Sequence, residues 1–336
     1  MDGVDDVREK TYTYLRMALV ALLVALGFSV IWQTYQQGWT PLDSVSAYYY
    51  SPAQGIFVGS LIGLGACMIA LRGVNAVEEA FLNLGGMFAA VVAVVPTSRG
   101  KDYQTAIQAC RESDSPLLTQ QGAGRFDCPT VRALAAATRA NVENNLLALV
   151  VVGALSLAAV WYFTTRNRTP GGGTHSLSFR WGFWSALALV AAAGILLAVD
   201  LDFVIANVHF ISATGLLVSI VVVAVSNAVR EEGTVVPGSG RRMTGPAVRA
   251  GMTALQPRRD HRLNVYAGLA WALVVVAVLG AIGVVVGLVS LFWVELAVAA
   301  LFVAFWLAQT LGELPPTAGG GGLDTTAADT PSGHAR

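Results

Sequence analysis

The chain has 336 residues, of which 55% are hydrophobic and only 12% are charged. Soluble domains usually carry about 25% charged residues, so this composition argues against a soluble globular protein and indicates a membrane protein. Its 21 basic and 21 acidic side chains give a formal net charge of zero, which provides no basic surface for nucleic acid. The two lysines, Lys10 and Lys101, lie outside the apolar runs, which argues against a retinal protein with a Schiff-base lysine.

Eight stretches are long and apolar enough to cross a bilayer, because its hydrocarbon core needs about 20 mostly apolar residues per helix. They cover approximately residues 15–35, 53–72, 78–96, 143–163, 180–200, 204–228, 265–287 and 290–311. The sequence therefore predicts an all-α polytopic membrane protein with about eight transmembrane helices. The segment before the first run is acidic and then mixed in charge, so we interpret that run as a retained helix and not as a signal peptide. In the third run, NLGGMFAA has small residues that favour close helix packing.

Arginine and lysine set the expected orientation, because short cytoplasmic loops carry an excess of them. The short loops at 36–52 and 201–203 contain neither residue, so we expect them outside the cell membrane. The N-terminal segment 1–14 and the C-terminus then both lie in the cytoplasm. The connection at 229–263 is rich in arginine, which predicts a basic cytoplasmic connector, with binding of anionic lipid headgroups as the alternative.

The segment 97–142 is the one long loop expected on the outside. It contains Cys110 and Cys128, and two cysteines in one extracytoplasmic loop predict a disulfide bond. Two free thiols are the alternative interpretation. Cys67 lies alone in the second run, where we expect it to be a small buried packing residue.

The last two runs predict a transmembrane hairpin at 264–312, added to a six-helix core at 15–228. The tail at 313–336 is rich in Gly, Pro, Thr and Ala without an apolar period, which predicts a disordered cytoplasmic tail. Glu295 lies within the eighth run. An ionisable residue at that depth costs a few kcal/mol unless it is paired or protonated, so Glu295 is expected to have a pairing partner or a function.

The first outer loop contains the sequence DSVSAYYYSP at 43–52. Its tyrosines fit the aromatic belt at the membrane interface, but Asp43 and the two serines beside them need another explanation. Ser44 and Ser46 alternate with apolar residues, so in an extended segment both hydroxyls face the same way. We expect the loop to fold over the outer mouth of the bundle with this face toward His209 and Asp202.

His209 lies near the outer end of the sixth run, with Ser212 one turn further along and Asp200 and Asp202 in the preceding turn. A histidine with two carboxylates can bind a metal or accept a proton. The other histidines are cytoplasmic in this topology and cannot reach it, which disfavours a zinc hydrolase, so no metal or cofactor is expected. The alternative is a buried histidine that is hydrogen-bonded within the outer cluster. The candidate outer-face cluster comprises Asp43, Ser44, Ser46, Tyr48, Tyr49, Asp200, Asp202, His209 and Ser212.

An xSxS element followed by P…FxGxL at the start of the second run resembles the Frag1/DRAM/Sfk1 family. It is also similar to a group of uncharacterised actinobacterial multi-pass proteins with a SxSxYY loop. The matching residues are Ser44, Ser46, Tyr48, Tyr49, Pro52, Phe57, Gly59 and Leu61, with a second match at His209 and Ser212 in NVHFISA. The chain departs from the pattern in its enlarged 97–142 loop and its added C-terminal hairpin. The resemblance implies regulators or organisers of membrane lipids, with no known active site.

Three functions follow as hypotheses. The first is a non-enzymatic protein that organises or senses membrane lipids through the outer cluster. The second is an enzyme acting on a lipid or envelope-precursor headgroup, with Asp43, Asp200, Asp202 and His209 as acid/base groups. The third is a small-solute or proton-coupled transporter that uses Glu295 and His209, which needs a polar path to Glu78 or Glu79.

Overall fold

The structure is a computed structural model that describes residues 2–73, 75–99, 101–112, 128–166, 177–228 and 259–313. Within these residues all regular secondary structure is helical and there is no β-strand. Nearly all of the predicted basic connector and the predicted tail after residue 313 lie outside the described residues.

Seven helices of the described chain are long and apolar enough to cross a membrane. They are α1 (Asp2–Gln36), α3 (Ala76–Val94), α5 (Cys128–Arg166), α6 (Leu177–Val199), the run of α7 (Leu201–Phe203), η2 (Val204–Val208) and α8 (His209–Ala228), α10 (Arg259–Val286), and α11 (Leu291–Glu313). The remaining predicted run forms α2 (Gln54–Ala70), whose 17 residues span about 26 Å and fall short of the bilayer core. The all-α polytopic membrane fold is therefore confirmed, whereas the count of eight spanning helices is not.

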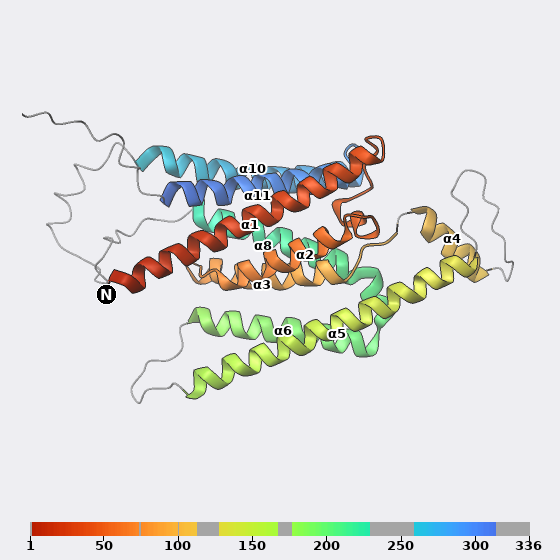
Figure 1. Cartoon of the computed structure of the whole chain (residues 1–336), viewed down its shortest axis with the longest axis horizontal. Helices are drawn as coiled ribbons and strands as arrows, with labels where there is room; N and C mark the ends of the chain where they lie inside the picture. The colour runs from red at the N-terminus through yellow and green to blue at the C-terminus, as the bar shows by residue number, and fades with distance from the viewer. Residues whose placement is uncertain are drawn as a thin grey trace, which may run out of the picture.

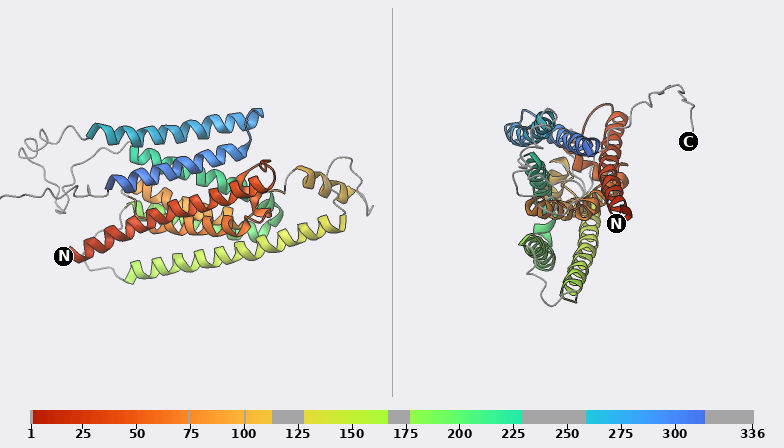
Figure 2. Two further views of the ribbon diagram at one scale, coloured as in Figure 1. Left: turned by 45° about the horizontal axis from the view of Figure 1, so that its top comes forward. Right: turned by 90° about the vertical axis from the view of Figure 1, so that its left-hand side faces the viewer.

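The helices form one bundle in which α3 packs against both α2 and α8, and α1 packs against α2 and α11 (Figure 1). The turn between α10 and α11 passes through Gly287 at φ +77°, a conformation that favours glycine. The α10–α11 pair and the α5–α6 pair lie on opposite sides of the group formed by α1, α2, α3 and α8 (Figures 1 and 2). The largest fully buried side chains include Trp306, Phe302 and Phe305 of α11, so the C-terminal hairpin is part of the main core.

Helices α2 and α3 approach each other at two facing glycines. A Cβ atom placed on Gly65 would lie 2.5 Å from the carbonyl oxygen of Gly86, and a Cβ on Gly86 would lie 2.5 Å from that of Gly65. Only residues without a Cβ permit this backbone approach, which is the close packing that the small residues of NLGGMFAA predicted.

Helix α5 has 39 residues and is therefore about 58 Å long, well beyond the thickness of a bilayer core of about 30 Å. Its N-terminal part extends past the bundle and pairs there with the short helix α4 (Lys101–Glu112), as Figure 1 shows. The segment 97–142 was expected to be a loop, but its described residues are mostly helical, in α4 and in the start of α5. Both helical parts lie outside the apolar part of the bundle and are rich in polar and charged residues. A search for apolar runs therefore does not detect them.

Candidate functional site

The candidate site lies at one end of the bundle, which we call the η1 end. This end carries the connection from α1 to α2, the residues after α3, the helix α4 and the short turns before α7 and α11 (Figure 1). The predicted outer-face cluster and Glu295 belong to this end.

The sequence DSVSAYYYSP forms the short 3₁₀ helix η1 (Val45–Tyr50) and not an extended segment, so the expected extended conformation is wrong. The cause is local: the Ser44 hydroxyl oxygen accepts a hydrogen bond from the Ala47 N–H at 3.1 Å and caps the turn. Ser44 and Ser46 are both buried, so the loop does fold onto the bundle.

Helix η1 packs against α2 and α11. The Glu295 carboxylate accepts a hydrogen bond from the Val45 N–H at 2.6 Å, and the Ser46 N–H also faces it. Phe292 N–H donates to the carbonyl oxygen of Asp43 at 3.2 Å. Glu295 therefore has a pairing partner as expected, and this partner is the backbone at the start of η1. A carboxylate suits this position because it satisfies N–H groups that begin a helix.

Tyr48 is a core residue and does not anchor the loop in the headgroup layer. Its side chain is fully buried, and its ring lies 5.9 Å from that of Phe292. The Tyr48 hydroxyl is hydrogen-bonded to the Thr34 hydroxyl, and the Leu42 N–H donates to it at 3.4 Å. The neighbouring Tyr49 is also buried, and its ring packs edge-to-face on Phe57.

His209 follows the single π-helical turn η2 and is buried. Its Nδ1 lies 2.6 Å from the carbonyl oxygen of Val95, which can only accept, so Nδ1 carries the proton and donates. Ser212 is buried one turn further along α8. The histidine thus fixes the residues that follow α3 to the start of α8, in agreement with the interpretation of a hydrogen-bonded buried histidine.

The predicted carboxylates do not converge on His209. Asp200 caps α7, where its Oδ1 accepts from the Phe203 N–H at 2.8 Å, and Asp202 forms an exposed ion pair with Arg139 of α5. Asp43 is exposed. Among the described residues no group of three His, Cys, Asp or Glu side chains is placed to hold a metal ion. The four groups proposed for acid/base catalysis therefore do not share one site, and Asp200, Asp202 and His209 each bind a different partner.

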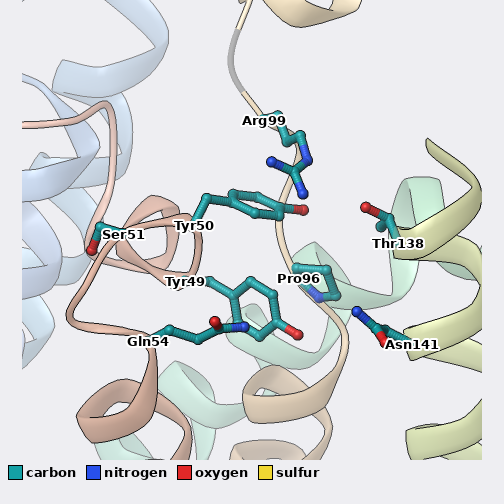
Figure 3. Close-up of a pocket in the computed structure, with 8 residues that line it drawn as sticks. All are labelled: Tyr49, Tyr50, Ser51, Gln54, Pro96, Arg99, Thr138 and Asn141. Atoms are coloured by element: carbon teal, nitrogen blue, oxygen red, sulfur yellow. The ribbon is translucent and has the colours of Figure 1, made fainter. Parts of the chain in front are cut away.

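A polar cavity of about 270 Å³ opens beside η1 (Figure 3). Four segments that are far apart in the sequence form its walls: the end of η1, the start of α2, the residues after α3, and α5. The lining residues are Tyr49, Tyr50, Ser51, Gln54, Pro96, Arg99, Thr138 and Asn141. Of the predicted cluster, only Tyr49 lines this cavity.

Arg99 and Tyr50 lie against each other in the lining of this cavity. The guanidinium carbon of Arg99 lies 3.9 Å from the centroid of the Tyr50 ring and 5.8 Å from that of Tyr103, distances at which a cation is attracted to a ring face. The Tyr50 hydroxyl donates to the Thr97 carbonyl oxygen at 2.8 Å. Burial raises the pKa of Tyr50 to about 12, although the charge of Arg99 opposes the shift. Tyr50 is therefore neutral near pH 7.

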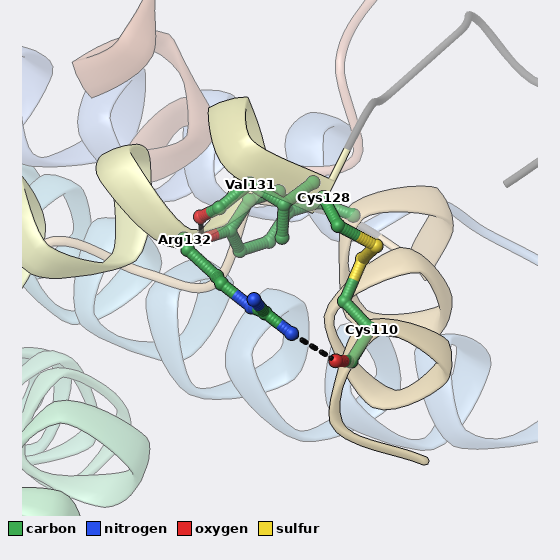
Figure 4. The surroundings of a disulfide bond; sticks show 5 residues. Cys110, Cys128, Val131 and Arg132 are labelled. Carbon is green, nitrogen blue, oxygen red and sulfur yellow. Dashed lines mark hydrogen bonds between the residues drawn. A yellow bond between two sulfur atoms is a disulfide. The ribbon is translucent and has the colours of Figure 1, made fainter. Parts of the chain in front are cut away.

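The predicted Cys110–Cys128 disulfide is present and joins α4 to the start of α5, with a Cα–Cα distance of 5.5 Å (Figure 4). Arg132 donates to the Cys110 carbonyl oxygen at 2.9 Å, and Tyr103 contributes to a small apolar core around the bridge. Because Tyr103 of α4 also lies close to Arg99, the bridge ties α5, which lines the cavity, to a helix that contacts one residue of the lining. Cys67 is a free, partly buried thiol in α2.

A second polar group lies at the opposite end of the bundle. Asn227 of α8 donates to the Glu78 carboxylate at 2.9 Å and accepts from Gln309 of α11 at 3.1 Å. Between Glu295 and Gln309, a distance of about 21 Å along α11, the buried side chains are Val298, Phe302, Phe305 and Trp306. Along α11, apolar side chains therefore separate the polar groups at the two ends, while α8 carries the buried Ser212 and Ser219 between His209 and Asn227.

Compared with known proteins, the chain significantly matches no family model, no curated protein and no solved structure. The resemblance to the Frag1/DRAM/Sfk1 family therefore stays a prediction from sequence motifs. The long apolar helices define the class: this is an integral membrane protein.

Proposed function

We propose that the protein binds the headgroup of a membrane lipid in the cavity beside η1, and that it organises or regulates lipids without chemical turnover. The observation that carries this proposal is the position of the cavity. Its walls are built where the apolar helices end: α2 begins at Gln54, α3 ends at Val94, and the apolar part of α5 follows Asn141. Headgroups occupy this layer of a bilayer.

The lining of the cavity supports a headgroup as the ligand. Hydroxyl, amide and guanidinium groups face it, and these are the groups that hydrogen-bond phosphate, glycerol or sugar oxygens. A volume of about 270 Å³ is slightly below the usual range of about 300–1,000 Å³ for ligand sites, which fits a headgroup without its acyl chains.

The non-enzymatic part of the proposal rests on the separate roles of His209, Asp200 and Asp202 described above. The orientation is also proposed: the η1 end faces outward and both termini face the cytoplasm. The arginine distribution of the connections and the Cys110–Cys128 bridge support it, because disulfides persist in oxidising compartments.

Lipid binding by the purified full-length protein tests the proposal. Native mass spectrometry of wild type, Asn141→Trp and Asn144→Trp would follow retained and added lipids. Asn141 lines the cavity, whereas Asn144 is exposed one turn further along α5 and does not line it. We expect the large ring in Asn141→Trp to block the cavity and abolish the bound lipid, while Asn144→Trp retains it.

Equal lipid retention by the two variants would contradict the cavity as the binding site. Recovery of lipid with a cleaved or transferred headgroup after incubation with the wild-type protein would contradict the non-enzymatic assignment. That result would instead support the hypothesis of an enzyme that acts on a lipid headgroup.

A further inference from the structure

We infer that the cavity beside η1 recognises the phosphate of an anionic lipid, with Arg99 as the recognition residue. This inference rests on the proposed function, because it assigns a ligand chemistry to the same cavity. Arg99 is the one charged side chain among the residues that line it, and none of them is acidic. The nearby Asp202 is already paired with Arg139 outside the cavity. The lining thus has a net positive charge.

Arg99 has unused hydrogen-bonding capacity. Its Nε atom is buried and has no hydrogen-bond partner within the described structure. This atom has almost no accessible surface, so a ligand in the open cavity does not reach it. An anionic oxygen in the cavity would instead accept hydrogen bonds from the terminal N–H groups of the same guanidinium.

The aromatic rings hold the guanidinium group in place before a ligand arrives. Figure 3 shows Arg99 over the ring of Tyr50, with Asn141 and Thr138 across the same space. A planar guanidinium forms paired hydrogen bonds with phosphate oxygens, and stacking on a ring reduces the side-chain entropy that binding would otherwise cost. The amides of Gln54 and Asn141 are neutral donors elsewhere in the same lining.

The same lining argues against a preference for zwitterionic headgroups. Ethanolamine carries a primary ammonium and choline a quaternary ammonium, and the lining contains no carboxylate for either. A ring face can also bind such a cation, but the Tyr50 ring already holds the Arg99 guanidinium. A phosphate with no accompanying cation, as in phosphatidylglycerol, matches the charge of the cavity. A soluble phosphate compound shares this chemistry, so the experiment must distinguish the two sources.

The experiment measures binding to the full-length protein in detergent with three probes: phosphatidylglycerol, phosphatidylcholine and inorganic phosphate. The variants are Arg99→Gln, Arg99→Lys and the charge-matched control Arg166→Gln, whose exposed side chain lies at the far end of α5 and outside the cavity. We expect wild type to prefer phosphatidylglycerol over phosphatidylcholine. Arg99→Gln should lower phosphatidylglycerol affinity about tenfold, Arg99→Lys less, and Arg166→Gln not at all.

Three outcomes would overturn the inference. Equal affinity of wild type for the two lipids would exclude charge recognition, and this comparison needs no variant to fold. Unchanged phosphatidylglycerol binding in Arg99→Gln would remove Arg99 from the site. Tight, Arg99-dependent binding of inorganic phosphate that phosphatidylglycerol does not displace would assign the cavity to a soluble anion.

Failure of this inference is distinguishable from failure of the proposed function. If both lipids bind equally and Asn141→Trp abolishes both, the cavity is a headgroup site without charge selection. If Asn141→Trp and Arg99→Gln leave all lipid binding unchanged, both proposals are wrong.

Discussion

The carboxylate of Glu295 accepts a hydrogen bond from the backbone N–H of Val45, a residue 250 positions earlier in the chain. This bond joins the first loop of the bundle to its last helix. It also holds η1 in the position where its far end, at Tyr49 and Tyr50, forms one wall of the cavity. The position of the cavity wall therefore depends on a residue outside the cavity.

Removal of the Glu295 carboxylate should weaken this attachment. In Glu295→Ala the part-buried N–H group of Val45 loses its acceptor, which costs about 1–3 kcal/mol, and Glu295→Gln should cost less because its amide oxygen still accepts. Thermal unfolding in detergent would measure the change. Glu143→Ala, at an exposed position of α5, is the matched control, and an equal unfolding temperature for both alanine variants would contradict the role of Glu295.

The glycine contact between α2 and α3 should not accept a methyl group. Gly65→Ala would place a Cβ atom 2.5 Å from the backbone oxygen of Gly86, so the two helices must separate. We expect a loss of about 1–3 kcal/mol of stability, as for other overpacked positions. In Gly59→Ala, on the same helix, the new methyl group meets no atom within 4 Å, so its stability should be unchanged or higher. Similar unfolding curves for the two variants would argue against the contact.

Loss of the disulfide should act on the cavity from a distance. Replacement of Cys110 and Cys128 together by serine removes a crosslink between residues 18 apart, which is worth about 3 kcal/mol in the chain-entropy model. We expect hydrogen exchange to become faster in α4, and lipid affinity to fall because Tyr103 no longer holds Arg99. Cys67→Ser, in α2, should change neither quantity. Retention of wild-type exchange protection in the double variant would show that α4 does not need the bridge.

Alkaline pH should destabilise the protein through Tyr50. Its pKa is raised to about 12 in the folded protein, so between about pH 10 and 12 the unfolded chain releases this proton first. The stability present below pH 10 is therefore lost as the pH rises through this range. Tyr50→Phe cannot ionise at this position and should lose less stability over the same range. Parallel stability–pH curves for wild type and Tyr50→Phe, measured by denaturant unfolding, would contradict this assignment.

The apolar helices were predictable from sequence because hydrocarbon thickness imposes a length and a composition on them. The disulfide was predictable from two cysteines that share one loop. By contrast, the start of η1 is held by a local bond that Ser44 accepts and by a distant carboxylate, Glu295. The alternation of serines with apolar residues favoured an extended segment instead. The helical part of 97–142 carries no membrane signal, so a search for apolar runs overlooks it.

The cavity was not predictable for a different reason. Gln54, Arg99 and Asn141 come from segments that helix packing brings together, and no spacing in the sequence relates them. The predicted cluster relied on Asp200, Asp202 and His209 being close in sequence. In the structure each of them has a different partner. Asp200 accepts from a backbone N–H group, Asp202 pairs with an arginine, and His209 donates to a backbone carbonyl oxygen. The segment 97–142 contains five arginines and one lysine, so its sequence does not single out Arg99.

The bond between Val45 and Glu295 also sets an order of events during biosynthesis. Ribosomes add about 5–20 residues per second, so Val45 is synthesised on the order of 10 to 50 seconds before Glu295. During this interval the first loop has no carboxylate to dock on, and the cavity has no fixed wall. A nascent chain, or one truncated before α11, would therefore carry its apolar helices without a finished binding site. Ligand recognition would begin only when the last helix has been inserted.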